Sequence, residues 1–390
     1  MSDQAGGDAT ERTDGGATER ADPGDAVTGF GRFFDRDFSL YRYRVPLSLV
    51  LLVVLLRPVV SHPMLAGYEQ LATTMLIWML FVAGFNLLLG FTGLLSFGHA
   101  LFLGMGMYSI GIGLSKFQTP FLLAAGVGFV LTGLVAYAIA KLVVGKGEIY
   151  FAMLTIAFGQ AAFFIVNYNP FGLTEGSDGI SQNTLPPWIE SFRGAKTVTF
   201  LPEMLNGWYV LVGAVVLVGG IVLWQLIRSP FGRTLIAIRE NDKLARALGV
   251  NTTRYKVWAF VISALYAAVA GMLLEINDQG AVLETFHWSV SGDAVLMSVL
   301  GGMSYFAGAF TGVFVWLFSE DFLTGFETLH FPTRGLSLVT LELGDLLVHY
   351  RFFLGLLFVV IIVVAPRTGL WGFLKKGTMR VAARISEVIR

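Results

Sequence analysis

The sequence predicts an all-α polytopic membrane protein with about 8–10 transmembrane helices, some of them glycine-rich and partly broken. Three observations support this fold class. Of the 390 residues, 55% are hydrophobic and only 14% are charged, whereas soluble domains carry about 25% charged residues. Many apolar runs approach the roughly 20 residues that a membrane-spanning helix needs. A β-barrel would instead show a weak two-residue alternation.

The first 29 residues differ in composition from the rest of the chain. They carry seven acidic and two basic residues and almost no large apolar side chains, so they cannot bury enough surface to order themselves. They also lack the basic start and apolar core of a signal peptide. We expect residues 1–44 to form a disordered acidic tail with a basic juxtamembrane segment, residues 45–375 the transmembrane domain, and residues 376–390 a basic tail.

Ten apolar segments follow this tail. Two of them, 288–304 and 306–319, are short for full spans, which leaves two interpretations open: ten separate spans, or eight plus a hairpin that is broken or re-entrant. Glycine is dense in 93–113, and small residues let helices approach closely in lipid. That segment is either a tightly packed interior helix or one that also lines a path. The expected spans are 45–61, 70–91, 93–115, 120–144, 149–168, 207–227, 256–275, 288–304, 306–319 and 351–366.

Lysine and arginine predict the orientation, because they are enriched in cytoplasmic loops. They cluster before the first span, in 228–256 and after the last span. Residues 320–350 carry five acidic residues against Arg334. We therefore expect both termini and residues 228–256 in the cytoplasm, and residues 169–206 and 320–350 outside the cell.

Polar residues are sparse inside the predicted spans, and an ionisable residue there is a functional candidate by default. His99 is the one that lies well inside a span. We predict that it forms a substrate path together with Asn86, Ser96 and Gln160. The alternative for each is a hydrogen bond between helices. Solvation explains the carboxylates near the outer ends of spans, namely Glu275, Asp278 and Asp293.

Composition and motifs exclude several classes of function. The chain has no mid-span carboxylate for a coupling ion and no G-x-x-x-x-G-K-[ST] phosphate loop. It has no cysteine and no catalytic or metal-ligating constellation, so we expect no enzymatic site, metal or cofactor. A net charge of zero gives no reason to expect nucleic acid as a partner. A passive channel or facilitator remains, as does a pump subunit that another protein powers.

The stretch "RENDKLARALGVNTTRYK", residues 239–256, predicts one short polar helix between two apolar spans. Asn241 or Asp242 can cap its start, and Gly249 can end it in the left-handed conformation. The apolar face consists of Leu244, Ala247 and Leu248 at helical spacing, flanked by Lys243 and Arg246. A passive channel has no need for such a helix, whereas a subunit driven from the cytoplasm needs a rigid element on which its partner docks.

These residues also carry a family resemblance, over about residues 45–375. The chain resembles the membrane permease subunits of the ABC importers for branched-chain amino acids, a family that also contains urea and amide importers. One departure is Glu175 in "TEGSDG", where relatives often read T-G-G. The segments that carry the resemblance are "GFNLLLGFTGLLSFGHALFLGMGMYS" (84–109), "GEIYFAMLTIAFGQ" (147–160), "GSDGI" (176–180), "SPFGRTLIAIRENDKLARALGVNTTRYKVWAFVISALYAAVAG" (229–271), "VLGGM" (299–303) and "PRTGLWG" (366–372).

The resemblance implies a multi-pass subunit of the cell membrane without enzymatic activity of its own. Its expected partners are ATP-binding subunits, a second related permease subunit and an extracytoplasmic substrate-binding protein. Residues 228–256 would be the cytoplasmic coupling loop, and its ATPase contacts would be Leu244, Arg246, Ala247, Leu248 and Gly249. Branched-chain amino acids are the expected substrates. The alternatives are a passive channel or facilitator, and an ABC permease for urea or short amides.

Overall fold

In the computed structural model, the chain divides into two units, residues 1–48 and 49–390. The structure describes residues 44–60, 69–181, 185, 187–194, 206–325, 350–364, 369–373 and 375. The predicted acidic tail up to residue 43, most of the acidic segment 320–350 and the basic tail 376–390 therefore lie outside the described residues.

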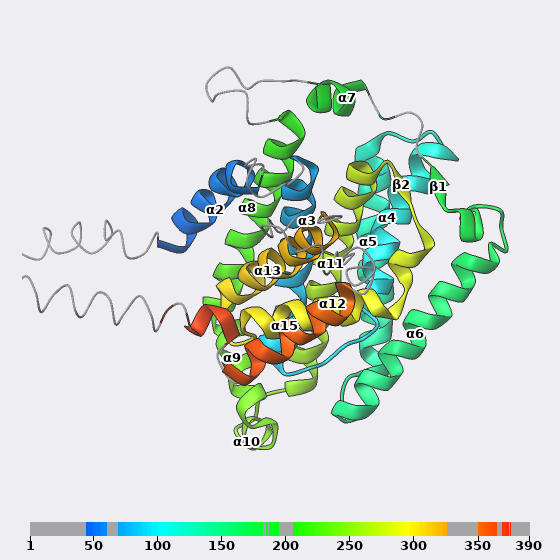
Figure 1. Cartoon of the computed structure of the whole chain (residues 1–390). Helices are drawn as coiled ribbons and strands as arrows, with labels where there is room; N and C mark the ends of the chain where they lie inside the picture. Colours follow the sequence, from blue (N-terminus) through cyan, green and yellow to red (C-terminus); the bar gives the residue numbers. More distant parts are fainter. Residues whose placement is uncertain are drawn as a thin grey trace, which may run out of the picture. The chain divides into compact units, whose positions relative to one another are not determined.

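Helices occupy all ten apolar segments that the sequence predicts (Figure 1). The elements in chain order are α2 (Arg44–Val60), α3 (Glu69–Asn86), the π-helix η2 (Leu87–Phe91), α4 (Ala100–Ser115), α5 (Phe121–Val143), α6 (Glu148–Tyr168), η3 (Gly176–Asp178), β1 (Ile180–Ser181), α7 (Pro187–Gly194), α8 (Gly207–Arg228), α9 (Pro230–Glu240), α10 (Asp242–Ala247), α11 (Thr252–Asp278), β2 (Gly280–Ala281), η4 (Leu283–Phe286), α12 (Trp288–Gly301), α13 (Phe306–Gly325) and α15 (Tyr350–Val364).

The helices differ in how much of a membrane they could cross. Within the described part of the chain, five helices are long and apolar enough for a full span, and α2 and α4 are shorter apolar helices. The helices α12 and α13 are bent by 114° relative to each other. The two helices therefore form neither one straight span nor an antiparallel pair of spans. The chain breaks between them, at residues 302–305. The five long spans are Gln70–Phe91, Phe121–Val143, Glu148–Tyr168, Gly207–Arg228 and Thr252–Asp278.

Two predicted boundaries are wrong. Helix α13 runs to Gly325, beyond the predicted end at 319, and the second error concerns the start of α4. The sequence placed a span at 93–115, but α4 begins at Ala100 and residues 93–99 are irregular. The preceding helix ends in a π segment, and Gly93 then adopts a φ of +78°. Glycine enters that left-handed region without steric cost, so the chain leaves the helix there and returns to helical geometry seven residues later.

Helix α11 forms the centre of the unit and packs mainly against α3, α4 and α5 (Figure 1). Small residues make this close packing possible. A Cβ atom on Gly106 of α4 would overlap the backbone of Ala268, and one on Gly271 of α11 would overlap the carbonyl group of Leu103. Close backbone contact of this kind is how small residues hold helices together in lipid. The part of the glycine-rich segment that forms α4 is therefore packed in the interior.

The two ends of α11 carry different structures. Its first turn follows α9 and α10, whereas its last turn leads into β2, which pairs antiparallel with β1 through Ile180 and Ala281. A helix of 27 residues is roughly 40 Å long, so α10 and the β1–β2 pair lie at opposite ends of the unit (Figure 1). This arrangement agrees with the predicted opposite locations of residues 228–256 and the segment that begins at 169.

Candidate functional site

The predicted short helix between two spans is α10, and both of its predicted ends are confirmed. The side chain of Asn241 accepts a hydrogen bond from the backbone N–H of Leu244 at 2.9 Å, which satisfies one of the free donors of the first turn. Of the two proposed caps, Asn241 is therefore the one used. Gly249 has a φ of +85° and ends the helix.

One ion pair and one hydrogen bond hold α10 against the start of α11, and a second ion pair lies within α10. Asp242 pairs with Arg246 at 2.7 Å and with Lys256 at 3.2 Å. The Nε of Arg246 donates a hydrogen bond to the hydroxyl group of Thr252 at 2.9 Å, and Ala245 is the buried residue of α10. Because a two-turn helix is not stable alone, these contacts with its own chain fix the direction in which α10 projects.

The apolar face of α10 points away from the rest of the described chain. Leu244 is 56% exposed and Leu248 is 76% exposed, and Ala247 between them is also exposed. Lys243 and Arg246 flank this face, as the sequence predicted. We call Leu244, Ala247 and Leu248 the apolar tip. A group of exposed apolar side chains within a charged loop suits contact with another protein.

The ion pairs of Asp242 predict that the stability of α10 depends on pH. Burial raises the pKa of its carboxyl group, but hydrogen bonds from Thr252 and Lys256 and the nearby charges outweigh this effect, so the pKa lies below its usual value of 3.8. A carboxyl group of this kind stabilises the folded state above its unfolded-state pKa, and the contribution disappears as the pH falls through the folded-state value.

We therefore expect faster amide hydrogen exchange in residues 242–249 of the Asp242→Asn variant at pH 7. The wild-type protein should show the same acceleration only below a pH of about 3.8. Glu240→Gln removes an exposed carboxylate from the adjoining helix and should have no such effect. Unchanged exchange in Asp242→Asn would show that these ion pairs do not hold α10.

Three of the four residues predicted to form a substrate path lie in the interior, and two of them form one cluster. His99 and Ser96 have no exposed surface. The ring nitrogens of His99 make hydrogen bonds with Ser96 at 2.9 Å and with Ser263 of α11 at 2.8 Å. The cluster therefore holds the irregular segment 93–99 against α11. Three aromatic rings surround the imidazole, those of Phe85, Phe102 and Phe260.

The other two predicted path residues lie apart from this cluster. Asn86 is buried, and its amide donates a hydrogen bond to the carbonyl oxygen of Tyr305 at 3.2 Å. Gln160 is half-buried. Two hollows in the described structure, of about 460 and 390 Å³, have apolar linings that share Phe129, Val215 and Val269, and the four path residues line neither of them. Their role in a substrate path stays a prediction.

Glu275 lies near the end of α11, where the sequence predicts a solvated carboxylate, but the structure shows that it is not solvated. Its side chain has no exposed surface, and neither carboxylate oxygen has a hydrogen-bond partner in the described structure. A buried polar group without a partner is costly. The apolar neighbours Met272, Leu273 and Ile276 do not distinguish contact with lipid from contact with other helices, so the local sequence does not indicate that this carboxylate is buried.

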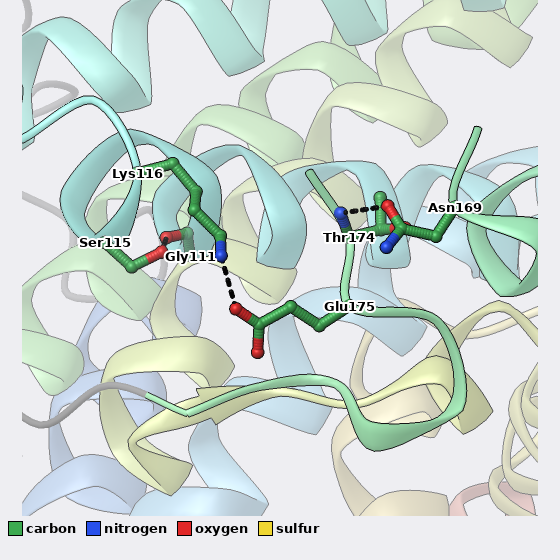
Figure 2. Close-up of polar contacts among 6 residues, drawn as sticks. All are labelled: Gly111, Ser115, Lys116, Asn169, Thr174 and Glu175. Carbon is green, nitrogen blue, oxygen red and sulfur yellow. Dashed lines mark hydrogen bonds and ion pairs between the residues drawn. The ribbon is translucent and has the colours of Figure 1, made fainter. Parts of the chain in front are cut away.

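At the opposite end of the unit, Glu175 links the loop after α6 to the end of α4. Its carboxylate pairs with Lys116 at 2.5 Å (Figure 2). Glu175 has a φ of +59°, a left-handed conformation that glycine adopts most readily. Glycine at this position would therefore remove a backbone cost that glutamate bears. The loop is further held by Asn169, whose side chain accepts a hydrogen bond from the backbone of Thr174 at 2.9 Å.

Two substitutions of Glu175 should have different effects. Glu175→Gly removes a left-handed backbone cost of about 1–2 kcal/mol, and also an ion pair worth about 0–1 kcal/mol, since both partners are partly exposed. We expect little loss of thermal stability. Glu175→Val also removes the ion pair, and it places a β-branched side chain on a backbone with positive φ, which such residues tolerate poorly. Its melting temperature should therefore fall. Equal losses in the two variants would show that the ion pair, not the backbone, dominates.

Comparison with known proteins assigns the chain to a family. The family model described as "Branched-chain amino acid transport system / permease component" matches residues 67–365. The high-affinity branched-chain amino acid transport system permease protein LivM of Salmonella typhimurium is 30% identical over 276 residues, which are 65% of this chain and 63% of that protein. The chain therefore spans less than two thirds of that relative's length. No solved structure matches the chain.

Further relatives carry different substrate names. A probable branched-chain amino acid transport permease protein LivM of Methanocaldococcus jannaschii is 26% identical over 206 residues, 52% of this chain and 54% of that protein. The autoinducer 2 import system permease protein LsrC of Klebsiella pneumoniae is 34% identical over 154 residues, 36% of this chain and 40% of that protein. Because the family match covers most of the chain, this multi-pass membrane protein belongs to the family of branched-chain amino acid transport system permease components.

Proposed function

We propose that this chain is the translocation subunit of an ABC importer for branched-chain amino acids, and that a separate ATPase subunit drives it by docking on α10. The observation that carries the proposal is the apolar tip. Leu244 and Leu248 are exposed on a capped helix, and exposed apolar side chains gain free energy when a partner covers them.

The architecture supports a cytoplasmic partner for α10. The helices α9, α10 and α11 follow one another without long connections, and each starts with a side-chain cap, from Ser229, Asn241 and Asn251. A rigid arrangement of this kind can pass a force from a docked ATPase to α11, the central helix of the unit. A passive facilitator would need no such element.

The family and the relatives favour branched-chain amino acids as substrates, because the LivM proteins are named for them. The LsrC relative favours an autoinducer-2-like solute as the second candidate. The proposed complex contains two permease subunits, the second a related chain, with two ATPase subunits and an external substrate-binding protein that selects the solute.

Reconstitution in proteoliposomes tests the proposal. The chain is purified with candidate ATPase, permease and binding-protein partners chosen from the neighbouring reading frames, and uptake of leucine, isoleucine, valine, urea, acetamide and autoinducer-2 is measured. We expect leucine, isoleucine and valine uptake that requires ATP on the ATPase side. Uptake at the same rate without ATP would indicate a passive facilitator. ATP-driven uptake of only urea, acetamide or autoinducer-2 would contradict the assigned substrate class.

A further inference from the structure

Arg239, in the last turn of α9, connects the cytoplasmic helices to the broken end of α3. Its Nη1 donates a hydrogen bond to the carbonyl oxygen of Gly90. The aliphatic part of the same side chain lies against Gly93, where an added Cβ atom would come within 3.1 Å of its Cγ. Arg239 thus contacts the π segment and the first residue of the irregular stretch that follows it.

The acceptor lies at a helix end that needs a donor. The last carbonyl groups of a helix have no partner within the helix, and a positive charge there complements the helix dipole. The backbone N–H of Leu94 donates its hydrogen bond to the carbonyl oxygen of Leu88, so it is not available to the carbonyl oxygen of Gly90. The π-helix at 87–91 is a type of irregularity that occurs frequently at functional sites.

Gly90 also contacts the break between α12 and α13, on another side of the same residue. A Cβ atom on Gly90 would overlap the carbonyl oxygen of Met303 and the side chain of Asn86. The amide of Asn86 in turn donates to the carbonyl oxygen of Tyr305. Met303 and Tyr305 belong to the bend at which the two helices turn by 114°. The backbone of Gly90 therefore lies against this bend, so a displacement of Gly90 toward Met303 would push the bend.

We propose that Arg239 is a positioning residue that couples the movement of α9 and α10 to the α12–α13 bend through Gly90. This inference rests on the proposed ATPase docking at α10, which α9 joins directly through Asn241. When the docked subunit moves α10, α9 moves with it, and Arg239 carries the end of α3 along. Its substitution should separate ATP hydrolysis from movement of the transport path.

Three variants separate the donor from the packing. Arg239→Met keeps an apolar stem on Gly93 and removes the donor. Arg239→Lys restores a cationic donor. Arg233→Met is the matched control, because Arg233 lies on the same helix and is exposed, and among the described residues its side chain bonds to the nearby carbonyl oxygen of Arg228.

The main readout needs no substrate. The chain has no cysteine, so Ser304→Cys places a single thiol in the chain, at an exposed position of the bend. The rate of maleimide labelling is measured in the complex with and without a non-hydrolysable ATP analogue. In the protein that retains Arg239, in Arg239→Lys and in the Arg233→Met control, we expect the ATP analogue to change the labelling rate at least threefold. In Arg239→Met we expect the analogue to leave the labelling rate unchanged.

The second readout is leucine uptake per ATP hydrolysed. Arg239→Met should lower it about tenfold while ATPase capture and membrane accumulation stay normal. If Arg239→Met does not accumulate, Arg239→Gln replaces it, because glutamine keeps the Cβ and Cγ on Gly93 and ends short of Gly90. An equal nucleotide response in the wild-type and Met or Gln backgrounds would overturn the inference alone. Unchanged labelling in a wild-type complex that still takes up leucine with ATP would also overturn the inference alone, whereas absence of ATP-driven uptake in that complex would overturn the proposed function.

Discussion

Ala247→Asp is expected to abolish ATP-driven uptake and capture of the ATPase subunit, while membrane accumulation and thermal stability stay normal. Ala247 is exposed at the centre of the apolar tip, so aspartate there costs the isolated chain little. In a docked complex the carboxylate would be buried without a partner, which costs on the order of 3 kcal/mol or more. Affinity for the ATPase should therefore fall by roughly 100-fold or more.

Ala237→Asp provides the matched control, since it makes the same chemical change at an exposed alanine of α9. Co-purification of the ATPase and uptake into proteoliposomes are measured for both variants. Gly249→Val should resemble Ala247→Asp, because valine tolerates the φ of +85° poorly. An Ala247→Asp protein that retains its ATPase and transports at the wild-type rate would contradict the docking role of α10.

Gly271→Leu is expected to prevent folding of the helical unit. A Cβ atom at this position would already overlap the carbonyl group of Leu103 in α4, so α4 and α11 would have to separate. Overpacking in a core typically costs about 1–3 kcal/mol, occasionally more. Here the obstacle is backbone rather than a flexible side chain, so we expect a cost at or above the upper end of that range.

Gly126→Leu is the control for this substitution. Gly126 also lies within a predicted span, in α5, but an added Cβ atom would have no neighbour within 4 Å. Size-exclusion profiles in detergent and melting temperatures are compared between the two variants. Gly271→Leu should yield aggregated protein, whereas Gly126→Leu should behave as wild type. A monodisperse Gly271→Leu protein of normal stability would show that the crossing of α4 and α11 tolerates separation.

The parts of this structure that sequence alone predicts are those set by local chemistry. The cap at Asn241 and the helix end at Gly249 follow from residue type, because each is satisfied within a few residues of the chain. The apolar tip likewise follows from helical spacing. The ten apolar helices follow from hydropathy, since the membrane requires every backbone group to be satisfied within a helix.

The parts that sequence did not predict depend on contacts between distant segments. The hydrogen bond from Arg239 joins residues 149 positions apart, and no local pattern distinguishes that arginine from its neighbours. The burial of Glu275 depends on how α11 sits among the other helices. The late start of α4 follows from the π segment and from Gly93, whose left-handed conformation is one of several that glycine can adopt. The left-handed backbone of Glu175 likewise depends on the loop around it, because glutamate by itself does not favour a positive φ.

Photo-crosslinking from Leu248 tests the central claim most directly. A benzophenone amino acid replaces Leu248, which is 76% exposed on the apolar tip, and membranes that contain the assembled complex are irradiated. The control carries the same probe at Val218, which is 64% exposed on α8 within a predicted span. We predict a covalent adduct with the ATPase subunit from position 248 and none from position 218. Adducts from position 248 that contain only this chain or lipid would contradict the account.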